Sequence, residues 1–486
     1  MITPPEISWI AIAPDLTLAV GAALVLLVDV QWKPPPRVWG WVVGVTLAVA
    51  AGFTVVQWLE GIDAAAAGDS GALIAFSGMI TMDGLTVFAR LALLTATVLG
   101  VTGGWRFVVG LGRRGAEALA LVLLATSGFS LMVASNNLVM MFLGLEVGSI
   151  ALYVLAGLAR ERRESEEAAI KYFLLGSFAS ALFVYGVALI YAGTRQFEVL
   201  EIRHFLDNFI VTSPAVIYIG LGLVIAGLGF KVSAAPFHAW APDVYQGAPA
   251  GLVGYMAAVA KVAGFAAITR VLLTALPELD ATWLPVVAGM SVLSMLLGAV
   301  LALVQGDVRR LLAYSGVAHA GFIMTGVVGG STGPILFYLA IYSIQLIGAF
   351  AVVAVVSGPD GAGSSMDRYR GLGRRSPLLA SSFAVLLLGM GGLPLTSGFV
   401  AKFGVFTEAW ARGYEWLVIV AVVASVIAFA FYIRVIVVMY MDDDQAEAAP
   451  RVGPEGWVLA VAVGTTILWG IFPSSLLDLA ADALPI

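Results

Sequence analysis

The sequence predicts an all-α integral membrane protein with about fourteen transmembrane helices. Hydrophobic residues make up 60% of the 486 positions and charged residues only 12%, whereas soluble domains have about 25% charged residues. The 55 glycines suit close packing of helices in lipid, because small side chains let two backbones approach each other. Lipid is therefore expected to be the main solvent of this chain.

Fourteen apolar runs are long enough to cross a hydrocarbon layer of about 30 Å as helices. The expected spans are 8–30, 38–59, 81–103, 116–134, 137–159, 168–193, 213–238, 249–274, 282–304, 310–329, 332–356, 377–411, 415–440 and 455–473. We expect four segments: three N-terminal helices (1–115), a repeat of helices 4–8 (116–275), a repeat of helices 9–13 (276–440), and a C-terminal loop with the last helix (441–486). No basic region precedes the first run, so a cleaved signal peptide is not expected.

Composition also limits the chemistry. The chain has no cysteine, which excludes disulfides, thiolate-bound iron–sulfur clusters and Cys-ligated zinc. It has three histidines and no HExxH pair, so a metal site is not expected. No glycine-rich phosphate loop follows a strand, and nucleotide binding is therefore not supported. Any redox centre is expected on a partner chain.

The distribution of basic residues predicts the orientation. Short loops rich in Lys and Arg stay in the cytoplasm, and the odd-numbered loops with their helix ends hold seventeen such residues against four in the even loops. The seventeen are Lys33, Arg37, Arg106, Arg113, Arg114, Arg160, Arg162, Arg163, Lys171, Arg309, Arg310, Arg368, Arg370, Arg374, Arg375, Arg434 and Arg451, and the four are Arg195, Arg203, Arg270 and Arg412. Both termini are therefore expected on the outer side of the membrane.

The seventh and twelfth expected spans are interrupted in the same way. The seventh contains KVSAAP at 231–236, and the twelfth contains GGLP at 391–394 followed by Ser397, Gly398 and Lys402. Pro and Gly free backbone groups that lipid cannot satisfy, so such breaks occur where protein or water lines the gap. Paired broken helices indicate inverted repeats, here helices 4–8 and 9–13.

Several titratable residues fall inside the expected spans. They are Glu146, Lys231, Lys261, His319 and Lys402, with His238 just after the first break. A charge at the bilayer centre costs about 2.5–3.5 kcal/mol on insertion scales, which makes such residues candidates for function. One interpretation is a row of protonatable groups joined by water. The alternative is a static ion pair between Glu146 and Lys231 that holds two helices together.

Other charged residues are expected to serve structure. Arg90 and Asp83 are weaker candidates for function, and Arg90 is expected to reach toward the membrane surface or to pair within the bundle. Asp15 and Asp29 lie near the ends of the first span and are expected to be solvated at the membrane surface. His204 lies in a charged outer loop and is expected to have no role.

Three long motifs carry a family resemblance. They are GFKVSAAPFHAWAPDVYQGAP at 229–249, DVRRLLAYSGVAHAGF at 307–322, and the segment 391–403. They resemble signatures of the antiporter-like membrane subunits of respiratory complex I (NADH-quinone oxidoreductase) and of multi-subunit cation/proton antiporters, and the resemblance covers nearly the whole chain. Lys402, the absence of a long lateral helix after the fourteenth span, and GLGRRSP at 371–377 favour the N-type over the M- and L-type subunits.

The resemblance implies a proton-translocating subunit of NADH:quinone oxidoreductase in a bacterial inner membrane. It implies that Glu146 and Lys231 couple in the first half-channel, that Lys261 is a central relay, and that Lys402 serves the exit half. His319 occupies the place of a relay or structural histidine. NADH, FMN, iron–sulfur clusters and quinone are then expected on partner subunits, with K-, M- and L-type neighbours. Ser315 and Gly316 depart from the family pattern of two hydroxyl residues, which weakens the relay there.

Two other functions remain open from the sequence. A subunit of a multi-subunit sodium/proton antiporter would keep the same Lys and Glu residues without using NADH. A non-pumping structural membrane subunit would explain the apolar spans, but it has no use for a charge at Lys261 in mid-span. A carrier of organic substrates is not favoured, because the buried polar residues are proton carriers rather than a ligand pocket.

Overall fold

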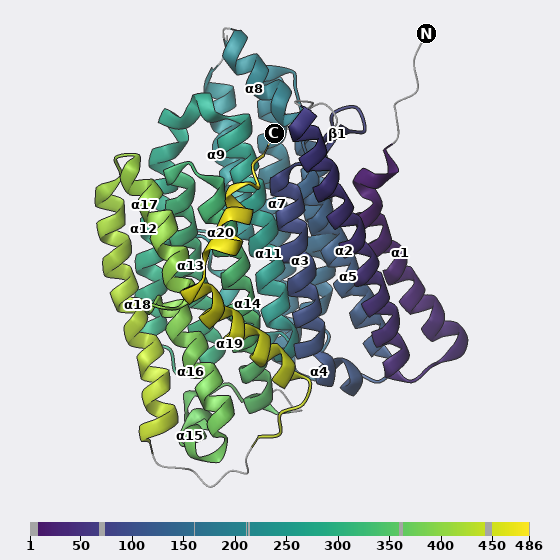
Figure 1. The fold of residues 1–486 in the computed structure, drawn as a ribbon, viewed down its shortest axis with the longest axis vertical. Coiled ribbons are helices and arrows are strands. Elements are labelled where there is room, and N and C mark those ends of the chain that lie inside the picture. Colours follow the sequence, from purple (N-terminus) through teal and green to yellow (C-terminus); the bar gives the residue numbers. More distant parts are fainter. Residues whose placement is uncertain are drawn as a thin grey trace.

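The chain forms a bundle of long helices standing side by side (Figure 1). The structure, a computed structural model, describes residues 8–67, 73–159, 161–209, 211, 214–358, 363–442 and 450–485. Residues 1–7 and Arg160, both used in the predictions above, lie outside the described residues.

Twelve helices among the described residues are long and apolar enough to cross a membrane. They are α1 (Trp9–Trp32), α2 (Pro36–Ala67), α3 (Gly84–Gly103), α5 (Arg114–Ala134), α6 (Leu138–Ala156), α7 (Arg163–Thr194), α9 (Pro214–Lys231), α11 (Ala250–Thr269), α12 (Asp280–Leu303), α13 (Val308–Gly329), α14 (Thr332–Ser357) and α18 (Glu415–Met441). A thirteenth unit is α19 (Glu455–Ile471), bent by 84° from α20 (Ser474–Ala481). The expected twelfth span is divided into α16 (Pro377–Gly391) and α17 (Ser397–Ala411). The predicted all-α membrane fold is confirmed.

Shorter elements connect these helices. They are β1 (Ile74–Ala75), β2 (Ile80–Thr81), α4 (Trp105–Gly110), α8 (Val199–Asn208), α10 (Trp240–Gly247), the π-helical turn η2 (Arg270–Ala275), the 3₁₀ turns η3 (Pro277–Leu279) and η4 (Met366–Tyr369), and α15 (Leu372–Arg375). Strands β1 and β2 pair antiparallel, with Ile74 opposite Thr81.

The chain direction places the start of α1 and the end of the chain on the same side. The Leu85 N–H, at the start of α3, donates to the Leu484 carbonyl at 3.4 Å. Helices α1 and α3 run in the same direction, so the first described residues and residue 484 share one side of the bundle (Figure 1). Five spans separate the start of α5 from that of α12, so these two helices begin on opposite sides, as inverted repeats require.

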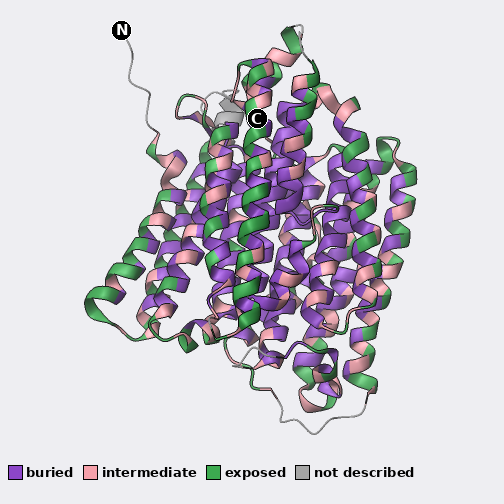
Figure 2. Ribbon diagram, turned by 180° about the vertical axis from the view of Figure 1, so that it is seen from behind, coloured by how far each residue is buried: buried purple, intermediate pink, exposed green. Residues whose placement is uncertain are grey.

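Burial identifies the centre of the bundle. Helices α11 and α13 are the most deeply buried spans of the described chain, whereas α2 is the most exposed, followed by α1, α7 and α18. Buried residues fill the middle of the molecule and exposed residues cover its outer helix faces (Figure 2). Lys261 lies on α11 and His319 on α13, so both lie in the interior.

Both expected helix breaks are present. Helix α9 ends at Lys231, and the chain turns through Ser233, whose φ of 61° lies in the left-handed region, before α10 begins. Helix α16 ends at Gly391, and Gly392 has a φ of 87°, which glycine adopts without steric cost. The second half of the seventh span extends to Gly247, nine residues beyond the expected end at 238. The extension is helical because Trp240, Val244 and Tyr245 bury one face.

Two predictions at the first span are wrong. Asp15 and Asp29 were expected in solvent, but only 7% of Asp15 and 8% of Asp29 is exposed. Helix α5 packs closely against α1, and both carboxylates have Arg partners, since Arg90 lies 2.5 Å from Asp15 and Arg113 lies 4.0 Å from Asp29. A cationic partner offsets the desolvation of a buried carboxylate.

Candidate functional site

Four titratable side chains from four different helices lie buried in the bundle. Lys231 ends α9, Lys261 lies on α11, His319 on α13 and Lys402 on α17. None of them is more than 5% exposed. Buried ionisable groups in a membrane protein are costly and therefore need specific partners.

Lys231 is held by a hydroxyl group and an aromatic ring. Its Nζ donates to Ser149 Oγ on α6 at 2.8 Å and lies 4.6 Å from the centre of the Phe129 ring. Attraction between an ammonium group and a ring face offsets part of the desolvation. No carboxylate lies within ion-pair distance of this ammonium among the described residues.

Glu146 approaches Lys231 without touching it. Glu146 is half-buried on α6, about one turn before Ser149, and accepts a hydrogen bond from Ser180 on α7. A cavity of about 10 Å³ between α6, α7 and α9 is lined by Ser149, Ser180 and Lys231, which is space for about one water molecule. The static ion pair considered above is therefore not a direct contact. Hydroxyl groups and a water-sized space separate the two charges.

Lys261 and Lys402 have the same kind of partner. Lys261 Nζ donates to the Val232 carbonyl at 2.9 Å, and Lys402 Nζ donates to the Gly391 carbonyl at 2.9 Å. Each acceptor lies at a helix break, where the i to i+4 ladder ends and a carbonyl needs another donor. Lys402 also lies 4.5 Å from the centre of the Phe322 ring. Each break thus binds one lysine.

His319 is surrounded by tyrosines. Its Nδ1 hydrogen bonds with Tyr338 Oη at 2.8 Å, and its Nε2 lies 3.2 Å from Tyr432 Oη. Its ring stacks on Tyr342 with 4.3 Å between ring centres. The ring and both nitrogens are therefore fixed in position, and each nitrogen has a partner that can donate or accept.

His238 does not join this group. It is half-buried in the turn between α9 and α10, and its ring centre lies 6.5 Å from that of Tyr314. Its Nδ1 has no hydrogen-bond partner in the described part of the chain. His204 was expected in a loop, but it lies on the short helix α8 and bonds only Asn208 among the residues described.

A polar cavity lies at the end of α10. Its volume is about 440 Å³, and Lys171, Asp243 and Gln246 line part of it. Asp243 binds both Lys171 and Arg310, each at 2.7 Å. These residues belong to the side of the bundle that carries the basic loops.

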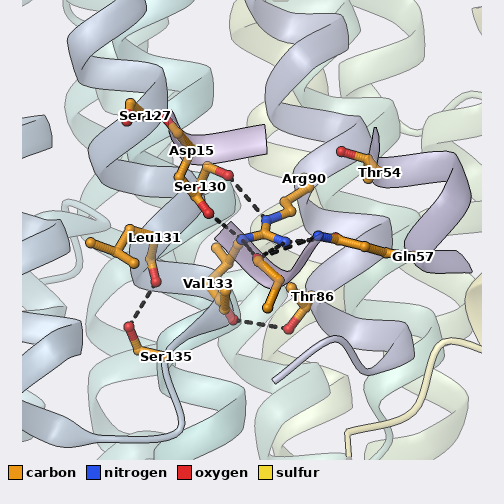
Figure 3. Close-up of polar contacts among 12 residues, drawn as sticks. Asp15, Thr54, Gln57, Thr86, Arg90, Ser127, Ser130, Leu131, Val133 and Ser135 are labelled. Carbon is orange, nitrogen blue, oxygen red and sulfur yellow. Dashed lines mark hydrogen bonds and ion pairs between the residues drawn. The ribbon is translucent and has the colours of Figure 1, made fainter. Parts of the chain in front are cut away.

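Arg90 holds the N-terminal helices together. Its guanidinium binds Asp15 of α1 at 2.5 Å, Gln57 of α2 at 2.7 Å and Ser130 of α5 at 3.1 Å (Figure 3). Arg90 itself lies on α3, so one side chain joins four helices. The structural role expected for Arg90 fits these contacts.

Sequence reasoning missed Arg270, which was placed in an outer loop. Arg270 is 1% exposed and binds both carboxylate oxygens of Asp83, at 2.8 and 2.9 Å. Burial alone raises the pKa of Asp83, but the Arg270 guanidinium outweighs it and holds that pKa below its ordinary value. Position at the end of an apolar run does not distinguish a solvated Arg from a buried one. Asp83 is the one residue whose charge, next to an apolar run, could have suggested that a buried Arg partner exists, but it lies far from Arg270 in the sequence.

The described residues contain no group of three or more His, Asp and Glu side chains that could hold a metal ion. The site consists of protonatable side chains, hydroxyl groups and carbonyls freed by helix breaks. Such groups can bind, release and pass protons.

Comparison with known proteins agrees with this arrangement. The family described as "NADH:quinone oxidoreductase/Mrp antiporter, TM" matches residues 135–428, and the fold and site define an antiporter-like membrane subunit. NADH-quinone oxidoreductase subunit N of Parafrankia sp. is 40% identical over 99% of this chain and 96% of its own length. The chain belongs to the NADH-quinone oxidoreductase subunit N family.

Solved structures give the same fold. A chain of respiratory complex I from Thermus thermophilus with bound aureothin is 32% identical and has a TM-score of 0.81, covering 96% of this chain and 99% of its own length. A chain of an archaeal membrane-bound sulfane sulfur reductase has a TM-score of 0.85 at 23% identity, covering 98% of this chain and 97% of that one. The second likeness concerns the fold alone.

Proposed function

We propose that this chain is a proton-translocating membrane-arm subunit of NADH:quinone oxidoreductase. The observation that carries the proposal is the row of buried lysines, two of which are bound to carbonyls at helix breaks. A lysine held by a neutral acceptor can lose its proton without leaving an unpaired carboxylate behind. If a lysine in a close buried ion pair lost its proton, the partner carboxylate would be left buried and unpaired, which costs several kcal/mol.

Glu146, Lys231, Lys261, His319 and Lys402 carry the protons in this proposal. Glu146 and Lys231 form the coupling pair, because the water-sized space between Ser149 and Ser180 lets the two charges act on each other without contact. A carboxylate that moves toward Lys231 favours its charged form, and one that moves away favours release. The cavity beside Asp243, at the end of α10, is the entry for water in this proposal. His238, which lies near that break, is the entry-side group.

The surroundings of the chain follow from the same proposal. Residues 116–275 and 276–440 form two half-channels in opposite orientations. The basic loops face the cytoplasm and both termini face the periplasm. Other subunits of the complex, of K-, M- and L-type, are the neighbours, and NADH, FMN, the iron–sulfur clusters and quinone bind to partner subunits.

The test compares proton pumping with electron transfer in the same membranes. Inverted vesicles carrying Lys231→Ala are expected to lose NADH-driven acidification while the complex stays assembled. Lys33→Ala is the matched control, because Lys33 is exposed at the end of α1 and its loss should leave pumping unchanged. If Lys231→Ala pumps and transfers electrons like the unaltered complex, the proposal is wrong.

A further inference from the structure

Lys261 and the tyrosines around His319 meet over Gly316. A Cβ atom at Gly316 would lie 3.8 Å from Lys261 Nζ and 3.3 Å from Tyr342 Oη. Both groups therefore lie over this glycine, one from α11 and the other from α14. Tyr342 Oη is buried and has no hydrogen-bond partner in the described part of the chain, so it is free to bond a proton carrier beside Lys261.

A short hydrogen-bonded chain begins at the residue before Gly316. Ser315 Oγ lies 2.5 Å from Tyr432 Oη, and Tyr432 Oη lies 3.2 Å from His319 Nε2. Ser315 and Tyr432 are 0% exposed and His319 is 3% exposed. Tyr432 comes from α18, so a helix outside the row of lysines supplies the link.

His319 in turn lies close to Lys402. Phe322, whose ring Lys402 covers, is three residues after His319 on α13. Residues three apart share one face of a helix. The hydroxyl chain thus begins at the residue next to Gly316, the glycine that faces Lys261, and ends beside Lys402.

We propose that Tyr432 is a proton-relay residue that joins Ser315 to His319. The assignment rests on the proposed function and adds residues to its path. A proton arriving from Lys261 binds Ser315 Oγ, whose own hydrogen passes to Tyr432 Oη, and the Tyr432 hydrogen passes to unprotonated Nε2 of His319. Each oxygen gains one hydrogen and loses one, so Lys261 loses the positive charge and His319 gains it. Rotation of the two hydroxyl groups restores the starting arrangement.

The hydroxyl group of Tyr432 is not needed for the packing of its ring. Its ring packs against Phe431 with 4.3 Å between ring centres, and a phenylalanine would keep that packing. A buried hydroxyl is costly without partners, and the partners here are another hydroxyl and a titratable nitrogen. Gly316 supplies no side-chain oxygen of its own, so the link depends on Ser315 of the same helix and on Tyr432 from α18.

The test removes the hydroxyl group and keeps the ring. In the whole complex, Tyr432→Phe is expected to lower the number of protons pumped per NADH oxidised, because without the hydroxyl group Ser315 and His319 can no longer exchange a proton through residue 432. The matched control is Tyr255→Phe, which removes a buried hydroxyl that bonds Thr126 and the Val122 carbonyl outside the relay. Its ratio should stay at the value of the unaltered complex.

Further variants decide between the relay and the proposed function. Ser315→Ala is a smaller change that also breaks the relay, and it should lower the same ratio. It replaces Tyr432→Phe as the test if the Tyr432→Phe complex fails to assemble. A normal ratio in an assembled Tyr432→Phe or Ser315→Ala complex overturns the relay, and so does an equal loss in Tyr255→Phe. If Lys231→Ala then still abolishes pumping, the proposed function stands without this relay. A normal ratio in Lys231→Ala refutes the proposed function itself.

Discussion

The three buried lysines of the site and two buried arginines, Arg90 and Arg270, have different partners. Lys231, Lys261 and Lys402 each donate to a neutral oxygen, whereas Arg90 and Arg270 bind aspartates. Arg remains protonated under all physiological conditions, while Lys can lose its proton when buried. Arg90 and Arg270 therefore fix helices to one another, and the three lysines are free to change charge.

Replacing Lys261 by Arg separates a fixed charge from an exchangeable proton. Lys261→Arg keeps a donor for the Val232 carbonyl but cannot release its proton. We expect NADH-driven acidification in inverted vesicles to fall by at least about tenfold, with the assembled complex still present on native gels. Pumping at the level of the unaltered complex would mean that Lys261 acts only as a permanent cation.

The Asp83–Arg270 pair makes a prediction about stability. Arg270→Met leaves the Asp83 carboxylate buried without its main partner, which costs about 3–5 kcal/mol. Thermal unfolding of the purified complex should begin at lower temperature in this variant. The double variant Asp83→Leu with Arg270→Met removes both charges and should recover most of the loss. Equal stability of the single variant and the unaltered protein would contradict this account.

Helix breaks are the elements that give the lysines their acceptors. The break after α9 exposes the Val232 carbonyl to Lys261, and the break after α16 exposes the Gly391 carbonyl to Lys402. In the second break α17 packs so closely on α16 that a Cβ at Gly398 would collide with the Gly389 carbonyl oxygen. Gly398 therefore fixes the distance between the two half-helices.

A methyl group at Gly398 tests this packing. Gly398→Ala is expected to push α17 away from α16 and to lower the free energy of unfolding by about 1–3 kcal/mol. Proton pumping should also fall, because Lys402 moves with α17. The control is Gly464→Ala on α19, where an added Cβ meets no atom within 4 Å. Thermal unfolding and vesicle acidification are measured for both. Indistinguishable behaviour of the two variants would show that the close approach has no role.

At the scale of the whole molecule, the bundle has one basic side and one side that carries the chain end. The exposed turn at Gly112 belongs to the basic side, whereas Glu201 on α8 belongs to the opposite one. Because the chain has no cysteine, any maleimide label found on this chain after it is separated from the other proteins comes from the introduced cysteine.

Cysteine labelling tests the proposed orientation. Glu201→Cys should react with a membrane-impermeant maleimide in intact spheroplasts, and Gly112→Cys should react only in inverted vesicles. This pattern follows from cytoplasmic retention of the basic loops. The reverse pattern would place both ends of the chain in the cytoplasm.

Much of the site was predictable because charge is rare in lipid. Lys231, Lys261 and Lys402 stood out as charges inside apolar runs, and the Pro and Gly residues beside them predicted both breaks. The sequence could not reveal that Lys261 and Lys402 bind the break carbonyls, nor that Glu146 and Lys231 are separated by serines. Those contacts join residues on different helices, and spacing along one helix does not encode them.

The sequence by itself determined the membrane fold, the order of the spans and the two broken helices. Each of these follows from local composition, since apolar length sets a span and Pro or Gly interrupts its hydrogen bonds. Only the tertiary structure decided which charges are paired, as Asp15 with Arg90 and Asp83 with Arg270 show. The tertiary structure alone also showed that Tyr432 lies within hydrogen-bond distance of His319. Helix packing sets these distances, because it places residues far apart in the chain within hydrogen-bond reach.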